Sequence, residues 1–433
     1  MSGERVVKFL IFSFVLFSLS SFVYSVFGSV DFSRVTLSSL FYDLGILSGL
    51  IGFFCLSFLI ISGDTSRFFD RFFGMDRIIK FQRWFAKFTF VFVILHPTFF
   101  ILSSNSMASY LLPQFSVIPI AVGTFALYIF IAVSIASVFY KRVSYRAWQY
   151  LHILTYVLFF MAFYHAVNMG SASLLKGIIF GILTLVIILG IIYRTAYKIR
   201  HIRSSRFIVD SVVKEIDNVS TVILKPKRNL NFKAGQFFFL RIDKNKLYAR
   251  HPFTCSSSPH ENQLSFTIKR EGRFTETAFN LKEGDKINVE GPFGRFHLNE
   301  ENSKRNLVFI AGGVGITPFL SILKDIIHRK KRQNVTLLYS SRRRNEIIAK
   351  NFIDGIKEAW FKKTYIITRK DLEESSEYHK GYLTKSLIKK STEDISNTTF
   401  LICGPENLKK SAVTILKELG VKSSEIKYED FFW

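Results

Sequence analysis

Residues 88–103 read FTFVFVILHPTFFILS, and this stretch decides the fold of the first half of the chain. It holds no charged side chain, and it lies in a mainly apolar segment, residues 79–103, that can cross a hydrocarbon core of about 30 Å as a helix. Five more segments have this character, at residues 6–28, 37–62, 117–139, 147–168 and 172–193. The sequence therefore predicts a six-helix transmembrane domain over residues 1–200.

The basic residues of the chain are arranged around these segments. Lys and Arg number 58 against 33 Asp and Glu, which gives a net charge of +25. The loops on one side carry little beyond Arg34 and Lys176, so the positive-inside rule places both chain ends in the cytoplasm, below a plasma membrane. No nucleic-acid module accompanies the charge, so we expect membrane lipid and not nucleic acid as a partner. The basic residues that follow the second, fourth and sixth segments include Arg67, Arg71, Arg77, Lys141, Arg142, Arg146, Arg194, Lys198 and Arg200.

Two further features concern the compartment. Arg5 and Lys8 precede the apolar stretch of the first segment and would also fit a cleaved signal peptide, but the segment is long and lacks a clear small-x-small cleavage site, which favours a retained helix. The three cysteines, Cys55, Cys255 and Cys403, are too far apart for a zinc or iron–sulfur site. Their odd number argues against a disulfide framework, so we expect the soluble part to face a reducing compartment.

Three of the nine histidines, His96, His152 and His165, lie inside predicted membrane spans. Ionisable groups are costly in lipid, so a functional role is the first interpretation, although any one of them alone could be a histidine hydrogen-bonded between helices. Histidine pairs on facing helices hold b-type haem, because each imidazole supplies one axial ligand. His96 and His165 fall at similar depth near the outer face, whereas His152 lies about 20 Å nearer the cytoplasm at the helical rise.

After residue 200 the pattern becomes that of a soluble protein. Short β-rich runs such as Phe237–Ile242 and Leu264–Lys269 alternate with Gly and Pro turns and predict a small antiparallel β-barrel over residues 203–301. Buried-strand runs at 307–310, 335–339, 364–367 and 399–402 alternate with helical stretches. These predict a doubly wound α/β domain over residues 302–433.

The membrane histidines give the chain a resemblance to the ferric reductase and NADPH oxidase transmembrane family, which has six helices and two stacked haems held by histidine pairs on the third and fifth. Asp76, Arg77 and the His96-Pro97 pair match the family's third helix. The usual second ligand lies fourteen residues before His96, and here that position is Gln82, a poor ligand for haem iron. His152 could therefore bind an inner haem alone, find another partner or bind no haem.

Two motifs of the barrel resemble the flavin site of ferredoxin-NADP reductase-like domains, a resemblance that covers about residues 205–433. The fingerprint is Arg250-His251-Pro252-Phe253-Thr254-Cys255-Ser256. In that family Pro252, Phe253 and Thr254 would line the isoalloxazine edge with Ser256 beside them, and Arg250 and His251 would contact flavin or its phosphates. Gly272, Phe274 and Thr275 belong to the second motif, residues 272–275, which matches the loop that holds the FAD pyrophosphate.

The α/β domain carries a nucleotide-binding turn. Gly312, Gly313 and Gly315, followed by Ile316, Thr317 and Pro318, come directly after a strand and open a helix, where backbone amides attract a pyrophosphate. Cys403, Gly404 and Pro405 follow the last predicted strand. In the reductase family Cys403 would lie by the nicotinamide during hydride transfer, while a buried cysteine at a strand end is the alternative.

Two other segments bear on the nicotinamide cofactor. Ser341, Arg342 and Arg343 end the second strand of the sheet and can pair with a 2′-phosphate, which predicts NADPH over NADH, whereas the alternative is a solvated basic turn. At the chain end, Phe431 or Trp433 would stack on the flavin, as a terminal aromatic does in the resembling family. The alternative for this tail is simple hydrophobic docking.

These expectations combine into one function. NADPH would reduce FAD, and electrons would pass through one or two b-type haems to an acceptor at the outer face, most plausibly dioxygen, giving superoxide or hydrogen peroxide. Ferric-chelate reduction is an alternative, but the short outer loops show no obvious iron-binding cluster. An electron-donor subunit that reduces a partner protein or quinone is a second class, and a structural protein with inactive motifs is a third.

Overall fold

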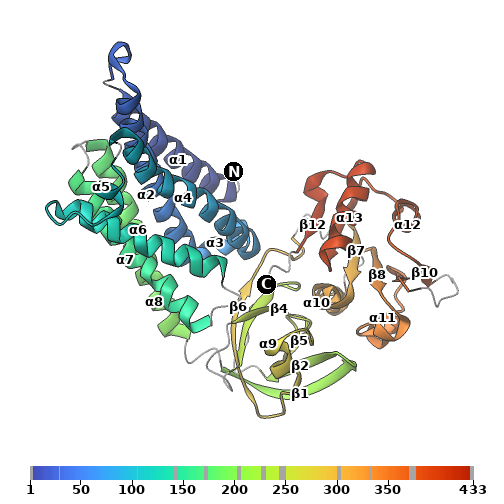
Figure 1. Ribbon diagram of the computed structural model, residues 1–433. Helices are drawn as coiled ribbons and strands as arrows, with labels where there is room; N and C mark the ends of the chain where they lie inside the picture. The colour runs from blue at the N-terminus through green and yellow to red at the C-terminus, as the bar shows by residue number, and fades with distance from the viewer. Residues whose placement is uncertain are drawn as a thin grey trace. The chain divides into compact units, whose positions relative to one another are not determined.

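The computed structural model describes residues 3–28, 30–104, 106–139, 145–169, 174–201, 206–225, 231–242, 250–299, 304–330, 333–369 and 377–429 (Figure 1). The chain divides into two compact units, Met1–Arg200 and His201–Trp433. Each unit has hydrophobic cores of its own.

The first unit is helical. Its long helices are α1 (Gly3–Phe27), α2 (Leu37–Asp64), α4 (Met75–Ser104), α6 (Ile118–Val138), α7 (Tyr145–Met169) and α8 (Leu174–His201). Each of the six is long and apolar enough to cross a membrane, which confirms the predicted spans. The short helices α3 (Ser66–Phe73) and α5 (Ala108–Leu111) and the 3-10 turn η1 (Phe32–Arg34) lie between them.

Two helix ends differ from the predicted segments by four residues or more. Helix α4 begins at Met75 and not near residue 79. Gly74, with a φ of 83°, ends helix α3, and the Asp70 carboxylate then accepts the first backbone N–H of α4, that of Met75, at 2.7 Å. Helix α8 continues eight residues past the predicted end to His201. Its last two turns contain Arg and Lys, which are good helix formers although they are poor membrane residues.

Phenylalanines form the core of this unit. Helix α2 packs along α4, α6 packs along α7, and α2 also contacts α7. Phe53 of α2 stacks on Phe159 of α7 with ring centroids 5.4 Å apart, and it meets Phe180 of α8 at 4.7 Å. Other large apolar side chains point outward, such as Phe9, which is 63% exposed, as expected for a surface that faces lipid.

The second unit begins with an antiparallel sheet whose strand order is β4-β3-β6-β1-β2-β5. The strands are β1 (Arg206–Ile216), β2 (Val219–Lys225), β3 (Phe237–Ile242), β4 (His251–Thr254), β5 (Leu264–Lys269) and β6 (Lys286–Phe293), and α9 (Arg273–Phe279) follows β5. The edge strands β4 and β5 approach each other through a bridge between Cys255 and Phe266, so the sheet curls into a half-barrel. This confirms the predicted barrel fold.

A parallel sheet of order β10-β9-β8-β7-β11-β12 follows. Its strands are β7 (Asn306–Gly312), β8 (Val335–Ser341), β9 (Phe361–Ile367), β10 (Tyr378–Lys380), β11 (Thr398–Cys403) and β12 (Ile426–Tyr428). The helices between them are α10 (Thr317–His328), α11 (Lys350–Gly355), α12 (Lys385–Ser391) and α13 (Glu406–Glu418), with 3-10 turns η3 (Gly313–Ile316), η4 (Arg344–Glu346) and η5 (Ser423–Glu425). The predicted doubly wound fold is confirmed.

The strand order reverses between β7 and β11. From β7 the chain adds β8, β9 and β10 on one side and then returns to place β11 on the other. In open α/β sheets, ligands bind beyond the carboxyl ends of the strands at such a switch point. The half-barrel packs against this domain, because Ser321 Oγ of α10 donates to the backbone oxygen of Ser257 at 2.6 Å and accepts the N–H of Gly235 at 3.3 Å.

Candidate functional site

The structure brings two of the three membrane histidines together. His96 of α4 and His165 of α7 have ring centroids 6.0 Å apart at an interplanar angle of 77°. Each ring is held by a different helix, since His96 Nδ1 lies 2.8 Å from the backbone oxygen of Gly45 on α2 and His165 Nδ1 lies 2.8 Å from that of Pro119 on α6. A carbonyl can only accept, so both Nδ1 atoms carry the proton and both Nε2 atoms keep a lone pair.

This arrangement fits two ligands on opposite sides of one metal. Imidazoles that bind a metal from both sides place their centroids roughly 6 Å apart, given metal–nitrogen bonds of about 2 Å. The carbonyls that fix the tautomer are the usual second contacts of a metal-binding histidine. His96 and His165 can therefore hold the iron of a b-type haem.

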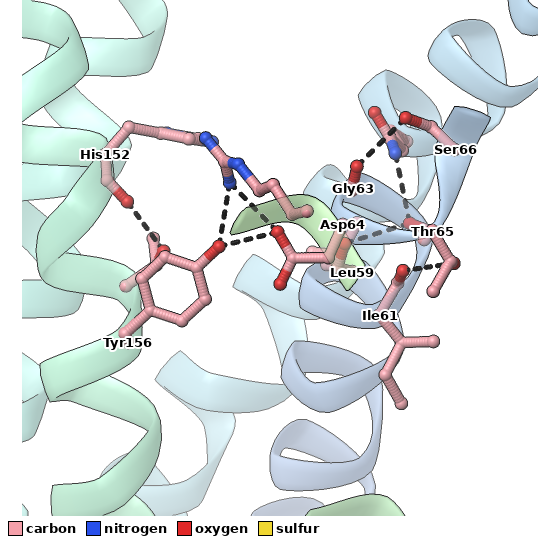
Figure 2. Close-up of polar contacts among 12 residues, drawn as sticks. Leu59, Ile61, Gly63, Asp64, Thr65, Ser66, His152 and Tyr156 are labelled. Atoms are coloured by element: carbon pink, nitrogen blue, oxygen red, sulfur yellow. Dashed lines mark hydrogen bonds and ion pairs between the residues drawn. The ribbon is translucent and has the colours of Figure 1, made fainter. Parts of the chain in front are cut away.

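His152 lies in different surroundings, beside a charged cluster at the other end of the bundle. Arg194 Nη1 of α8 donates to Asp64 Oδ1 at 2.9 Å and to Tyr156 Oη at 2.8 Å. Tyr156, one turn after His152 on α7, donates its hydroxyl to Asp64 Oδ1 at 2.6 Å. Figure 2 shows Tyr156 pointing toward Asp64 at the end of α2. Sequence reasoning missed this cluster, because the second span was ended at residue 62 and Asp64 was counted with the loop.

Gln82, at the position where the resembling family has its second histidine, also makes a hydrogen bond. Gln82 Nε2 of α4 donates to Ser62 Oγ of α2 at 3.2 Å. The side chain of Asp64 is only 2% exposed, and its Oδ2 atom has no hydrogen-bond partner within the described part of the chain. Among the described residues, that end of the bundle thus carries the Asp64–Arg194 ion pair and the Gln82 amide, in place of a second pair of facing histidines.

The two predicted flavin motifs meet in the half-barrel. The His251 ring of β4 lies 4.3 Å from that of Phe274 in α9, and Phe253 stacks on the same ring at 5.7 Å. Burial lowers the pKa of His251 below its ordinary value, which keeps the ring neutral near pH 7. The fingerprint and the pyrophosphate loop are therefore neighbours, joined by aromatic packing.

An open cavity of about 580 Å³ lies at the start of α9. Gly272 precedes the helix, and Thr275 Oγ1 accepts the backbone N–H groups of Glu271 and Gly272 at 2.9 Å each. The cavity is lined by Arg270, Glu271, Gly272, Arg273, Glu276 and Thr277. Arg273 and the helix start suit an anionic group such as a diphosphate, whereas Arg270 is already paired with Glu276 at 3.6 Å and Glu271 adds a negative charge.

Two fingerprint residues make internal contacts. Arg250 Nη1 binds the Glu290 carboxylate at 2.9 and 3.1 Å, and its guanidinium lies 4.5 Å from the Phe239 ring centroid. Ser256 is buried, where its hydroxyl shares hydrogen bonds with Ser265 and Thr267 at 3.1 Å each. The side chain of Ser256 thus packs in the barrel interior, and Pro252, Phe253 and Thr254 of β4 are the other fingerprint residues predicted to line a flavin.

The nucleotide-binding turn lies at the switch point of the sheet. A Cβ at Gly315 would be 2.3 Å from the backbone oxygen of Cys403, and a Cβ at Gly312 would be 2.8 Å from Pro405 Cδ. Gly404, with a φ of 158°, lies against Gly312 in the same way. These glycines let the turns after β7 and β11 pack backbone to backbone, whereas Ile316, Thr317 and Pro318 are buried side chains that anchor α10.

The same region brings in Glu429, which sequence reasoning missed. Its backbone N–H donates to Ile402 at 3.2 Å, and its Oε2 atom accepts from Thr254 Oγ1 at 3.4 Å, so it joins β11 to the flavin fingerprint. Burial and then the Glu429 carboxylate raise the pKa of the Cys403 thiol well above its ordinary value. Because the contact spans 175 residues of the chain, the sequence carries no local signal for it. Phe431 and Trp433 lie outside the described residues.

Two of the three residues predicted to bind a 2′-phosphate, Ser341 and Arg342, already have hydrogen-bond partners within the protein. Ser341 Oγ donates to the backbone oxygen of Arg343 at 3.1 Å, and Arg342 Nε binds Glu346 Oε2 at 3.0 Å. The side chain of Arg343 is exposed and makes no ion pair or hydrogen bond with any described residue. Of the three predicted residues, Arg343 is therefore the cation most available to a ligand.

Three family models match the chain in succession. Residues 48–163 match the ferric reductase like transmembrane component, residues 206–297 an FAD-binding domain and residues 309–414 an oxidoreductase NAD-binding domain. This is the architecture of the NADPH oxidase and ferric reductase family. The chain is accordingly an oxidoreductase with a multi-pass membrane component and domains for FAD and a nicotinamide nucleotide.

Individual relatives resemble part of the chain. A flavohemoprotein of Bacillus anthracis is 28% identical over 243 residues, which cover 52% of this chain and 60% of the relative. A plasma membrane-associated coenzyme Q6 reductase of Saccharomyces cerevisiae is 30% identical over 201 residues, covering 45% of this chain and 64% of the relative. The chain thus spans about 60% of the length of the curated relatives it matches.

A solved structure resembles about half of the chain. The flavohem-like FAD/NAD-binding domain of the nitric oxide dioxygenase from Vibrio cholerae is 24% identical with a TM-score of 0.47, and covers 53% of this chain and 98% of that domain.

Proposed function

We propose that this chain moves electrons from cytoplasmic NADPH across a plasma membrane to dioxygen at the outer face, producing superoxide and from it hydrogen peroxide. The broader activity, NAD(P)H-driven electron transfer across a membrane, is the one that the domain architecture supports. The observation that carries the proposal is the His96–His165 pair, whose ring spacing and fixed tautomers suit iron ligation. Each NADPH would reduce two dioxygen molecules and release NADP⁺ and one proton.

The residues of the chain have distinct tasks in this scheme. Bound FAD would accept a hydride and release single electrons, and b-type haem would carry them through the lipid. His96 and His165 would hold the haem iron near the outer face, within reach of dioxygen. In this scheme Gln82, which hydrogen-bonds to Ser62, would not be a ligand, and His152 would bind an inner haem alone, find another partner or bind no haem.

The soluble residues would orient the two flat rings. Pro252, Phe253 and Thr254 would line the flavin, and Gly312, Gly313 and Gly315 would admit the nucleotide pyrophosphate to the backbone. Cys403 stays protonated because its pKa is raised, so it can pack against the nicotinamide as a neutral group. Glu429 would accept hydrogen bonds from groups near the flavin, as it does from Thr254.

NADPH is proposed over NADH. Arg343 is an exposed cation at the end of β8, where the adenosine ribose lies in sheets of this kind. A 2′-phosphate would give it a charge-assisted partner that NADH lacks.

Dioxygen is proposed as the acceptor because ferric iron would need ligands. Among the described residues, no group of three His, Cys, Asp or Glu side chains is placed to hold a metal ion. Dioxygen needs only access to the haem edge.

A second function is favoured by one observation. The yeast relative is named a coenzyme Q6 reductase, so quinone is a chemically reasonable acceptor for a related reductase. In that case the membrane unit would deliver electrons to a quinone or a partner protein within the bilayer.

Spectroscopy and kinetics on the purified full chain test the proposal. Protein made with ample haem should contain FAD and at least one low-spin b-type haem, and NADPH should drive cytochrome c reduction that superoxide dismutase inhibits. Loss of both His96 and His165 should remove that haem while FAD remains. Absence of a Soret band in the parent would contradict the proposal, and dismutase-insensitive reduction of an added quinone would favour the second function.

A further inference from the structure

The two paired histidines are held by the same local arrangement on two different helices. His96 Nδ1 reaches the carbonyl of Gly45 on α2, and the residue four positions later on α2 is Gly49. His165 Nδ1 reaches the carbonyl of Pro119 on α6, and the residue four positions later is Gly123. Both hydrogen bonds measure 2.8 Å.

Both rings occupy the space that a side chain at the glycine would take. A Cβ at Gly49 would lie 2.5 Å from His96 Nδ1, and a Cβ at Gly123 would lie 2.6 Å from His165 Nδ1. These distances are shorter than any ordinary contact between a Cβ and a ring atom. The atoms that would have to move belong to rings that are already fixed by a hydrogen bond.

Helix geometry explains why the spacing is four in both places. The Cα–Cβ bonds of a helix tilt toward its N-terminus, so a side chain covers the turn before its own Cα. A residue at position i+4 therefore shields the carbonyl of residue i from a lateral donor. That carbonyl can accept a further donor beside its helical bond, and the Gly45 carbonyl also accepts the Ser48 hydroxyl at 3.0 Å. Only glycine at i+4 leaves the carbonyl open to an imidazole.

We propose that Gly49 and Gly123 are positioning residues for the haem ligands, each exposing the carbonyl that orients one histidine. The proposal rests on the proposed function, since it takes His96 and His165 as ligands of one haem. Each glycine thereby sets two properties of its histidine. The ring orientation is fixed, and the Nδ1–H···O=C bond makes Nε2 a stronger donor to iron, which lowers the reduction potential of the haem.

Four alanine variants of the full chain test this proposal. Gly49→Ala and Gly123→Ala should each lower the haem-to-FAD ratio. The haem that remains should be partly five-coordinate, should bind carbon monoxide when reduced, and should have a higher midpoint potential than the parent. Gly63→Ala on α2 and Gly181→Ala on α8 are matched controls, because a Cβ would have its nearest neighbour at 4.0 Å at Gly63 and none within 4 Å at Gly181.

A double variant separates ring displacement from misfolding. If Gly49→Ala acts by pushing the His96 ring, it should lower the thermal midpoint of the parent and cost little further in a His96→Ala background, where the ring is gone. A penalty that persists unchanged in that background would overturn the proposal. So would Gly49→Ala and Gly123→Ala proteins with unaltered haem content, spectrum and carbon monoxide binding, whereas a parent without a Soret band would instead contradict the proposed function.

Discussion

At the scale of single residues, the nucleotide site depends on which cations are already paired. Arg342 and Arg343 are adjacent and looked equivalent in the sequence, but Arg342 is tied to Glu346 and Arg343 is not. A paired guanidinium has to lose one partner before it gains another, so its net gain from a phosphate is small.

This difference predicts unequal effects of two alanine substitutions. Arg343→Ala should lower kcat/KM for NADPH by roughly ten- to a hundredfold, from the ~1.5–3 kcal/mol of a hydrogen bond to a charged group, and should leave NADH nearly unchanged. Arg342→Ala is the matched control and should have a smaller effect on the NADPH value. Steady-state rates with both nucleotides measure the ratio. Equal losses for NADPH and NADH in Arg343→Ala would remove this residue from 2′-phosphate binding.

At the scale of elements, the Asp64–Tyr156–Arg194 cluster joins three helices. Asp64 ends α2, Tyr156 lies on α7 between His152 and His165, and Arg194 lies where α8 continues past the predicted span. Gly190 lets α8 approach closely, since a Cβ there would be 3.2 Å from Asp64 Cβ. The cluster therefore fixes α7 and α8 against α2 near His152.

Removing one charge of this pair should cost more than removing both. Arg194→Met leaves the buried Asp64 carboxylate with Tyr156 alone, and we expect a loss of roughly 2–3 kcal/mol, below the 3–5 kcal/mol of fully buried pairs because water reaches the half-buried Arg194. Asp64→Asn combined with Arg194→Met should recover part of that loss. Thermal midpoints of the detergent-solubilised protein measure both, with Tyr156→Phe as a control that keeps the ion pair. If the double variant is as unstable as the sum of the single variants, the charges are not coupled.

The elements also show how far sequence could reach. Six spans and the main strands were predictable because apolar length and periodicity are local properties. The edge strands β10 and β12 were missed, because three residues are too few to show a periodic pattern of apolar side chains. The pairing of His96 with His165 followed from depth alone, but the glycines beside their rings and the contact of Glu429 with Thr254 depend on how separate elements pack.

At the scale of the whole molecule, the proposed function requires sidedness. Basic residues follow the second, fourth and sixth predicted spans, so the positive-inside rule would place the second unit, His201–Trp433, in the cytoplasm. His96 and His165 would then lie near the opposite face, whereas Asp64 and Arg194 would lie toward the cytoplasm. NADPH would be oxidised on one side of the bilayer, and the reduced acceptor would appear on the other.

Sealed proteoliposomes can test this sidedness because NADPH does not cross lipid. External NADPH reaches only those molecules whose soluble unit faces outward, and their acceptor face is then toward the lumen. We therefore expect external NADPH to reduce cytochrome c trapped inside the vesicles, with inhibition by trapped but not by external superoxide dismutase.

His96→Ala/His165→Ala protein, matched for FAD content, should oxidise NADPH with an artificial flavin acceptor yet leave the trapped cytochrome c oxidised. Reduction confined to external cytochrome c would mean that electrons leave at the flavin and not through the histidine pair. Consumption of NADPH only when a lipid-soluble quinone is added, with no lumenal product, would place the acceptor inside the bilayer and support the quinone function.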